Sequence, residues 1–252
     1  MSKRDDINEL YQPSTILSRM CLVLFWSDVL LSLVLLAASD SFHSVLTLIL
    51  VIIAFLYMAI SVFDDGILWY RAERERRKNG IQEAFGVSLS EYSTEGYYNN
   101  DIKDTELSYA ANMFESCFFT KEIGKRMLLS SIVKSLISII VLFVACRLIP
   151  NDDILLIISQ TVFSATLVEE TVQLLIFVYR INALFDDVYH EFVTVGITKK
   201  DQRVWLRWFC VEYESIKAHY RIRLNENIFR KYNSSLSQKW ECISSQIKTK
   251  AK

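Results

Sequence analysis

Proline and glycine, the residues that most often interrupt helices, are scarce in this chain. Two prolines and six glycines occur among 252 residues, and both residue types are unfavourable inside a helix. None of them lies within the long apolar runs described below. Secondary transporters, in contrast, typically bind solutes at helices that are interrupted by glycine or proline. A small-solute transporter is therefore the weakest of three functional hypotheses, behind a pore-forming effector and a membrane scaffold.

The sequence also lacks the motifs that carry enzyme chemistry. It contains no GxGxxG, P-loop, HExxH or GxSxG motif, so nothing indicates a nucleotide-phosphate site, a zinc site or a hydrolase nucleophile. Of the three histidines, His190 and His219 lie outside the apolar runs and His43 stands at the very start of one, which argues against a metal site within a membrane. We expect no catalytic residue, no bound metal and no cofactor.

Cysteine pairs with metal-binding or redox spacing are absent as well. The five cysteines form no CxxC pair, and two of them lie in apolar runs, so we expect all five to be free thiols. The net charge is −1 at pH 7. This balance gives no reason to expect a nucleic-acid duplex as a partner.

Apolar residues are abundant and are segregated from the charged ones. Hydrophobic residues make up 52% of the chain and charged residues 23%. A transmembrane helix needs about 20 apolar residues, and four segments meet this requirement: Met20–Ala38, Phe42–Phe63, Met127–Leu148 and Ile154–Tyr179. The short links at 39–41 and 149–153 make each consecutive pair a hairpin. The pattern predicts an all-α integral membrane protein with four transmembrane helices, arranged as two hairpins with helical cytoplasmic regions.

The basic residues predict the orientation of these hairpins. The regions are an N-terminal segment (1–19), a first hairpin (20–63), a central helical region (64–126), a second hairpin (127–179) and a C-terminal helical region (180–252). Lysine and arginine number three before the first span, nine in the central region and fourteen after the fourth span, with none in either short link. Because basic residues are retained on the cytoplasmic side, we expect both termini and the central region to be cytoplasmic.

Four ionisable residues within the predicted spans are the main candidates for function. Asp28 lies in the first span, Lys134 in the third, and Glu169 and Glu170 in the fourth. Charged groups in lipid are costly, so they are normally paired or line a water-filled path. Counted from the cytoplasmic ends, Asp28, Lys134 and Glu170 share a layer about 12–15 Å deep. The second span has no charged residue and is expected to face lipid.

Two interpretations of this polar layer remain open. Serine and threonine neighbours extend the ionisable residues into polar stripes, so the first, third and fourth spans can converge on a polar interior. In the third span, this stripe consists of Ser131, Lys134, Ser135 and Ser138. We expect Lys134 to pair with Asp28 or with Glu170. The layer then either holds the helices together through ion pairs or lines a conduction path in one chain or around an oligomer axis. Its excess of acids over bases would favour cations.

The second span is predicted to continue as one helix beyond the membrane and to end at Gly80. Four basic residues of this extension lie where lipid headgroups would be met: Arg74, Arg76, Arg77 and Lys78. A simple topogenic anchor is the favoured interpretation, and specific lipid recognition is the alternative. Residues 81–98 are expected to form a loop with short helical turns, and residues 101–120 regain the periodicity of a helix with a buried face.

The C-terminal region is predicted to be helical in three stretches. Residues 181–193 extend the fourth span, and helices follow over 201–221 and 225–244. An aromatic-rich face in the second stretch includes Trp205, Trp208 and Phe209. Internal packing or an interface with a partner or a second copy is the favoured interpretation of this face, rather than a ligand site.

Two short stretches, together with the layout, resemble a known family. Residues 79–85 (NGIQEAF) follow the second span, and residues 112–119 (NMFESCFF) precede the third. The chain resembles the four-transmembrane effectors associated with SMODS-type nucleotide cyclases in bacterial anti-phage operons. The layout is similar over the whole chain, whereas the residue similarity is confined to these stretches. Gly86 stands where the family has an acidic residue, and Ser88-Leu89-Ser90 replaces a Leu-Pro-Trp-like stretch.

The resemblance implies a membrane effector of anti-phage defence, located in the bacterial inner membrane. Such a protein oligomerises and permeabilises or depolarises the membrane when an infection-linked signal acts on its cytoplasmic part. Its expected partners are the lipid bilayer, further copies of the chain, and a cyclic-nucleotide or protein trigger. The alternative hypothesis is a non-conducting scaffold or regulatory subunit whose cytoplasmic helices bind a protein partner through the aromatic-rich face.

Overall fold

The regular elements of the chain are all helices. The computed structural model describes residues 6–37, 40–92, 94, 102–148, 168–195 and 200–250, and the predicted all-α class is confirmed for this part of the chain. Two compact units are present. The described residues up to 94 form the first unit, and those from 102 onward form the second.

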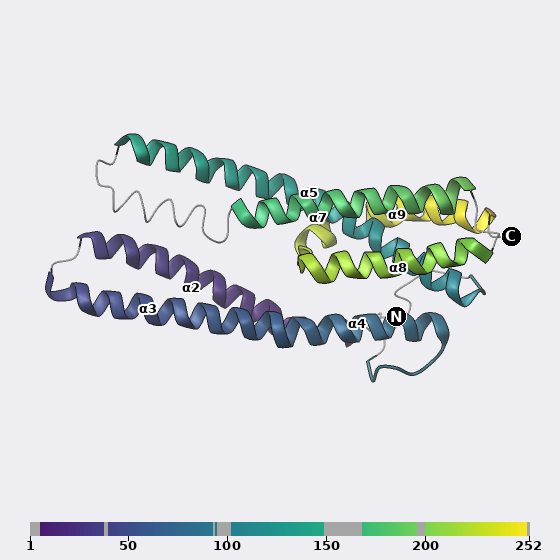
Figure 1. Ribbon diagram of the computed structural model, residues 1–252, viewed down its shortest axis with the longest axis horizontal. Coiled ribbons are helices and arrows are strands. Elements are labelled where there is room, and N and C mark those ends of the chain that lie inside the picture. The colour runs from purple at the N-terminus through teal and green to yellow at the C-terminus, as the bar shows by residue number, and fades with distance from the viewer. Residues whose placement is uncertain are drawn as a thin grey trace. The chain divides into compact units, whose positions relative to one another are not determined.

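The first unit is a helical hairpin that continues into a long extension (Figure 1). A short helix, α1 (Asp6–Leu10), precedes α2 (Gln12–Ala37), and α3 (Asp40–Phe63) returns antiparallel to α2. Pro13 lies in the first turn of α2, where a missing N–H group costs nothing because it would have no partner within the helix.

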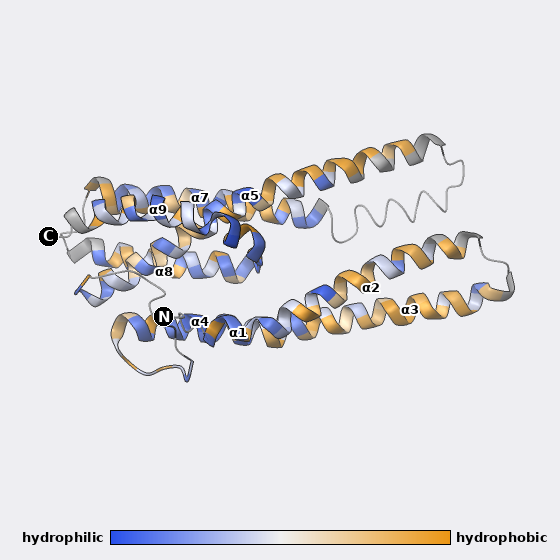
Figure 2. Cartoon of the chain, turned by 180° about the vertical axis from the view of Figure 1, so that it is seen from behind, coloured by the Kyte–Doolittle hydropathy of each residue, from blue (hydrophilic) through white to orange (hydrophobic). Residues whose placement is uncertain are grey.

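The two long helices of the hairpin pack through one face of each. The half-buried positions of α2 include a row spaced every three or four residues, at Leu17, Cys21, Leu24, Asp28, Leu31 and Leu35. On α3 they recur at Leu46, Leu50, Ile53, Tyr57 and Ile60. This spacing is typical of helices that cross at a small angle. Large apolar side chains cover the outward faces, as the hydropathy colouring of α2 and α3 in Figure 2 shows.

The second helix of the hairpin extends well beyond its apolar part. A π-helical turn, η1 (Asp64–Trp69), joins α3 to α4 (Tyr70–Phe85) without a break, so the predicted continuation is confirmed. The predicted end at Gly80 is wrong, because Gly80 is buried inside the helix. The helix ends instead at Gly86, which adopts φ +66° and donates its N–H to the carbonyl of Gln82 at 2.9 Å. Glycine adopts this left-handed cap with little strain.

Residues at the amino-terminal end of the first unit are tied to the extension. The ring of Tyr11 lies edge-to-face with Trp69, at 5.2 Å between centroids. Its hydroxyl donates a hydrogen bond of 2.9 Å to Glu73. The hairpin and the extension therefore form one packed unit, in which Ala72 is fully buried.

The second unit is a helical bundle (Figure 1), and its core is rich in aromatic residues. Its elements are α5 (Thr105–Leu148), α7 (Val168–Tyr189), the π-helical turn η2 (His190–Val195), α8 (Lys200–Tyr220) and α9 (Glu226–Lys250). Phe114 of α5 is fully buried. Its ring centroid lies 5.0 Å from that of Phe185, 5.3 Å from Phe192 and 5.5 Å from Trp240. The predicted helices over 101–120, 181–193, 201–221 and 225–244 correspond to these elements.

The surface of α5 changes character along its length. On α5, Phe114 and Ile123 are buried, whereas Leu129 and Phe143 are each 69% exposed. This change falls near Met127, the predicted cytoplasmic end of the third span. On α7, buried and exposed positions alternate along the whole described helix, with Leu174 and Ile181 buried and Tyr179 exposed between them. Figure 2 shows the corresponding change to apolar colour along α5.

The described residues contain two helical segments, rather than four, that are long and apolar enough to cross a membrane. These are Asp6–Ser32 and Phe42–Phe85, and they contain the first two predicted spans or most of them. The third predicted span, Met127–Leu148, is part of α5, but several of its outer side chains lie outside the described set. Most of the fourth, Ile154–Tyr179, and the outer link at 149–153 precede the described start of α7 at Val168.

Candidate functional site

A buried polar contact joins α5 to α7 at the level of the predicted polar layer. The hydroxyl of Thr171 on α7 lies 2.6 Å from that of Ser131 and 2.7 Å from that of Ser135, both on α5. Thr171 and Ser135 are buried. Hydrogen bonds between small polar side chains are a common way to hold membrane helices together. This cluster therefore fixes the rotation of α7 against α5 at this level.

Ser135 belongs to a stripe that the sequence predicts, whereas Thr171 was not predicted. The signal that could have found it is the spacing of the buried face of α7, which runs through Thr171, Leu174, Val178 and Ile181. Glu169 and Glu170 are themselves exposed on the isolated chain. The residue of α7 that meets α5 is thus the threonine beside the glutamates.

Three of the four ionisable candidates lie in the second unit. Glu169 accepts a hydrogen bond of 3.0 Å from Gln173, one turn further along α7. The charges of Glu169 and Lys134 both act on Glu170, so Lys134 on α5 and Glu170 on α7 are within electrostatic range of each other. This arrangement is compatible with the expected pairing of Lys134 with Glu170.

Asp28, the fourth ionisable candidate, belongs to the first unit. It is half-buried on α2. This helix packs on α3, as the predicted hairpin requires.

The aromatic-rich face of α8 divides into a buried part and an exposed part. Phe209 is fully buried and stacks on Trp205, with 6.5 Å between ring centroids. Trp208 is 46% exposed, and Val204 and Val211 on the same side of α8 are 64% and 66% exposed. Phe209 thus belongs to the bundle core, whereas Val204, Trp208 and Val211 form an exposed stripe.

The four basic candidates on α4 do not have equal surroundings. Arg76 pairs with Glu73 at 3.0 Å, and Lys78 pairs with Glu75 at 2.7 Å. Arg77 is half-buried and Arg74 is exposed. The hydrogen bond from Lys78, together with the one from Ser90, lowers the pKa of Glu75 below its ordinary value, although burial acts in the opposite direction. Arg76 and Lys78 are therefore already engaged within the helix, and Arg74 is the most accessible of the four.

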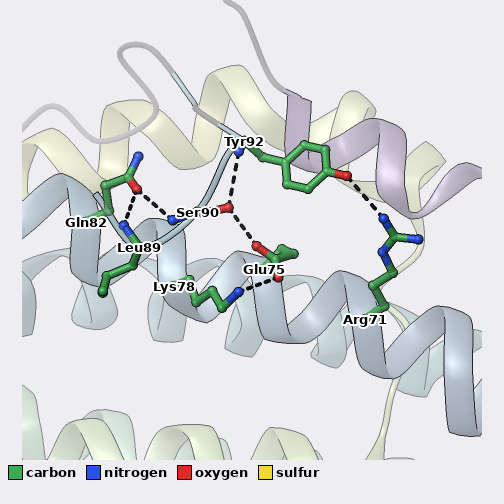
Figure 3. Close-up of polar contacts among 7 residues, drawn as sticks. All are labelled: Arg71, Glu75, Lys78, Gln82, Leu89, Ser90 and Tyr92. Atoms are coloured by element: carbon green, nitrogen blue, oxygen red, sulfur yellow. Dashed lines mark hydrogen bonds and ion pairs between the residues drawn. The ribbon is translucent and has the colours of Figure 1, made fainter. Parts of the chain in front are cut away.

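The segment after α4 folds back along that helix and is held by side chains (Figure 3). The side-chain oxygen of Gln82 accepts hydrogen bonds from the backbone N–H groups of Leu89 and Ser90, both at 2.9 Å. The hydroxyl of Ser90 donates to Glu75 at 2.7 Å. Arg71 donates to the hydroxyl of Tyr92 at 3.3 Å. The sequence predicts a loop here but does not indicate that it packs against its own helix.

In the bundle, burial controls the ionisation of two cysteines and one lysine. Desolvation raises the pKa of Cys117 well above its ordinary range and that of Cys210 to about 12, so both remain thiols at neutral pH. Desolvation lowers the pKa of Lys121, and the neighbouring charge of Lys125 lowers it further. Lys121 lies 3.6 Å from Asp186 and 3.6 Å above the ring of Phe185. These groups are structural parts of the core rather than reactive ones.

Neither metal-binding chemistry nor comparison with known proteins assigns a ligand to these residues. Among the described residues, no group of three or more His, Cys, Asp or Glu side chains could hold a metal ion. Among the cysteines whose side chains are described, no disulfide bond is formed: these are Cys21, Cys117, Cys210 and Cys242. No protein-family model, curated protein or solved structure matches the chain.

Proposed function

We propose that the chain is a four-span membrane effector that assembles as a homo-oligomer and permeabilises the bacterial inner membrane. Two hairpins cross the membrane, and the termini and the helical extensions lie in the cytoplasm. The polar layer of the second hairpin, with Lys134, Glu169 and Glu170, lines the conduction path. An infection-linked signal acting on the cytoplasmic part opens this path.

The observation that carries this proposal is the double role of α5 and α7. Each helix is buried in the aromatic bundle at one end and carries polar-layer residues at the other. Gly124 links the two regions, because a Cβ atom on it would lie 3.0 Å from Cγ2 of Val178. Tightly packed helices move as rigid elements. A change in the packing of the bundle would therefore be transmitted to Lys134, Thr171 and Glu170.

The chemistry of the polar layer supports conduction over packing alone. Packing is already provided by the buried contact of Thr171 with Ser131 and Ser135. The two glutamates are exposed beside it and are not needed to satisfy these hydroxyl groups. Exposed acids at this depth would be costly in lipid and are better accounted for by a water-filled path.

The test is membrane potential in bacteria that express the chain from an inducible promoter, read with a voltage-sensitive dye. We expect depolarisation before growth stops, either on expression or on phage challenge with the native neighbouring genes present. Glu170→Gln should weaken the depolarisation, although the amount of protein in the membrane stays the same. Val172→Leu, an exposed apolar position two residues away, is the matched control. Full depolarisation by the double variant Glu169→Gln/Glu170→Gln would show that the glutamates do not line the conduction path. If the unsubstituted chain leaves the membrane potential intact both on expression and on phage challenge, permeabilisation is excluded.

The second candidate function is a non-conducting membrane scaffold that binds a protein partner. The exposed stripe of Val204, Trp208 and Val211 favours it, because exposed tryptophan and valine in one row are typical of interfaces. On this alternative, cells that express the unsubstituted chain should keep their membrane potential throughout. Trp208→Ser should abolish the biological activity, because it removes the centre of the partner-binding stripe. Depolarisation by the unsubstituted chain contradicts this alternative.

A further inference from the structure

We infer that the turn between α8 and α9, residues 221–225 (RIRLN), binds the phosphate groups of anionic phospholipids at the cytoplasmic membrane surface. The inference rests on the proposed membrane position of the second hairpin. It concerns a surface that the sequence alone does not reveal, because no cluster of adjacent basic residues marks it. The exposed arginine of this turn is Arg221.

The turn lies beside the point where α5 changes from buried to exposed, and next to the buried face of α7. The backbone N–H of Asn225 donates to the sulfur of Met127, at 3.3 Å. On the other side, the ring of Tyr220 lies 6.0 Å from that of Phe177. Met127 begins the predicted third span and Tyr179 ends the predicted fourth. The turn is therefore held at the level at which the hairpin would enter the membrane.

The turn is held in place by packing and by hydrogen bonds at both of its ends. Its apolar residues, Ile222 and Leu224, pack against the bundle core. Asn225 caps α9, because its side-chain oxygen accepts the N–H of Ile228 at 3.1 Å. The N–H of Arg221 donates to the carbonyl of Lys217 at 3.0 Å and closes the end of α8. The alternation in RIRLN thus directs apolar side chains to the core and leaves Arg221 exposed.

The backbone of Arg221 is an independent indication that its side chain has a role. Among the described residues, Arg221 alone has a positive φ without being glycine, at 49°. Glycine is the usual residue at this position of a helix end, and other residues are strained there. Strain of this kind is retained where the side chain is used. An arginine at this position places an exposed positive charge at the carboxyl end of α8.

Other basic groups surround the turn. Lys125 is exposed on α5 two residues before Met127, and Arg180 is exposed on α7 next to Tyr179. The guanidinium of Arg180 lies 5.6 Å from the ring of Tyr220. The acids of this region hold other arginines, since Glu122 pairs with Arg126 at 2.9 Å and Glu226 pairs with Arg230 at 2.6 Å. Figure 2 shows strongly hydrophilic colour at the carboxyl end of α8. The surroundings of the turn therefore carry an excess of positive charge.

This combination favours a lipid phosphate over other anions. Guanidinium groups match phosphate oxygens in geometry. Basic groups next to the point where helices enter a membrane attract anionic lipids. The apolar face of α5 begins immediately beyond Met127, as the exposure of Leu129 shows. A phosphate bound at the turn would thus have its acyl chains beside this apolar face.

The experiment measures thermal unfolding of the full chain in phosphatidylcholine vesicles with increasing phosphatidylglycerol. We expect the melting temperature to rise with phosphatidylglycerol and the rise to shrink in high salt. Arg221→Gly removes the charge and the strain together, so it should unfold at the same or a higher temperature in phosphatidylcholine alone. Its apparent affinity for phosphatidylglycerol should fall about fivefold, with a further similar loss on adding Arg180→Gln. Lys239→Gln, at an exposed position on α9 away from the turn, is the matched control.

Retention of the full phosphatidylglycerol response by Arg221→Gly/Arg180→Gln would overturn the inference, as would an equal loss in Lys239→Gln. An equal rise with soluble glycerol phosphate would also overturn it, because the ligand would then not be a bilayer lipid. Extraction of the unsubstituted chain from membranes by alkaline carbonate separates the two proposals. Release of the chain by carbonate would contradict its proposed position in the membrane. If the chain is retained but its Arg221 variant responds normally to phosphatidylglycerol, only the lipid site is contradicted.

Discussion

At Gly124, the helices α5 and α7 leave little room for a side chain. A Cβ atom there would lie 3.0 Å from Cγ2 of Val178 and 4.0 Å from the ring of Phe177. The position lies one turn before Met127, where α5 leaves the buried bundle. A small residue at this crossing allows the two backbones to approach closely.

Gly124→Leu should destabilise the second unit by about 1–3 kcal/mol, because an overpacked contact forces neighbouring side chains and backbone to shift. Gly124→Ala should cost less, since Val178 needs to move only slightly. The measurement is denaturant unfolding in detergent, followed by the fluorescence of the bundle tryptophans. Ser130→Leu, at an exposed position of the same helix, is the control and should have little effect. Equal stability of Gly124→Leu and Ser130→Leu would contradict the close approach.

Single residues also show where sequence reasoning was sufficient and where it was not. Ser135 was recognised because serines and a lysine share one face of a predicted span. Thr171 was not recognised, since the charged pair Glu169–Glu170 dominates that part of the sequence and is exposed in the structure. The partner of a polar residue on a neighbouring helix depends on how the helices are rotated, and helical periodicity alone does not specify this rotation.

At the scale of elements, α4 and the segment after it behave as one piece. Gly80 was expected to end the helix, but an isolated glycine inside a helix costs only about 1 kcal/mol. Here it is buried, together with Asn79. The helix ends where the left-handed conformation of Gly86 allows the chain to reverse. Gln82 then holds the returning segment through two backbone N–H groups.

Gln82→Ala should release the segment over residues 87–92 while leaving the bundle intact. Each lost hydrogen bond is worth about 0.5–1.5 kcal/mol, so local opening should become markedly more frequent. Hydrogen exchange at Leu89 and Ser90 should accelerate, and the segment should become more sensitive to proteases. Ser88→Ala, an exposed position in the same segment, should leave both unchanged. Unaltered protection in Gln82→Ala would show that other contacts hold the segment.

At the scale of the whole molecule, the two units share one design, in which helices of the predicted spans continue as longer polar or amphipathic helices. In the first unit, α3 passes through η1 into α4. In the second, α5 runs unbroken from the bundle core into a predicted span. In the proposed orientation, both continuations lie on the cytoplasmic side.

The natural cysteines provide a test of this orientation. Cys242 on α9 is exposed, whereas Cys117 and Cys210 are buried and have pKa values raised by desolvation. A membrane-impermeant maleimide should label Cys242 in inverted membrane vesicles and not in intact cells, and Cys242→Ser should abolish the signal. The two buried thiols should react only after denaturation. Labelling of Cys242 in intact cells would place the C-terminal region outside and contradict the orientation.

The sequence by itself determined the helical class and the long apolar runs, two of which lie in helices long and apolar enough to cross a membrane. These features depend on local composition and on the cost of placing polar groups in an apolar environment, and both can be read from consecutive residues. Only the tertiary structure decided that Thr171 meets Ser131 and Ser135, that Phe209 is core while Trp208 is exposed, and that Asn225, in the turn after α8, contacts Met127. Such relations depend on helix rotation and on contacts between residues far apart in the chain, which no local pattern specifies.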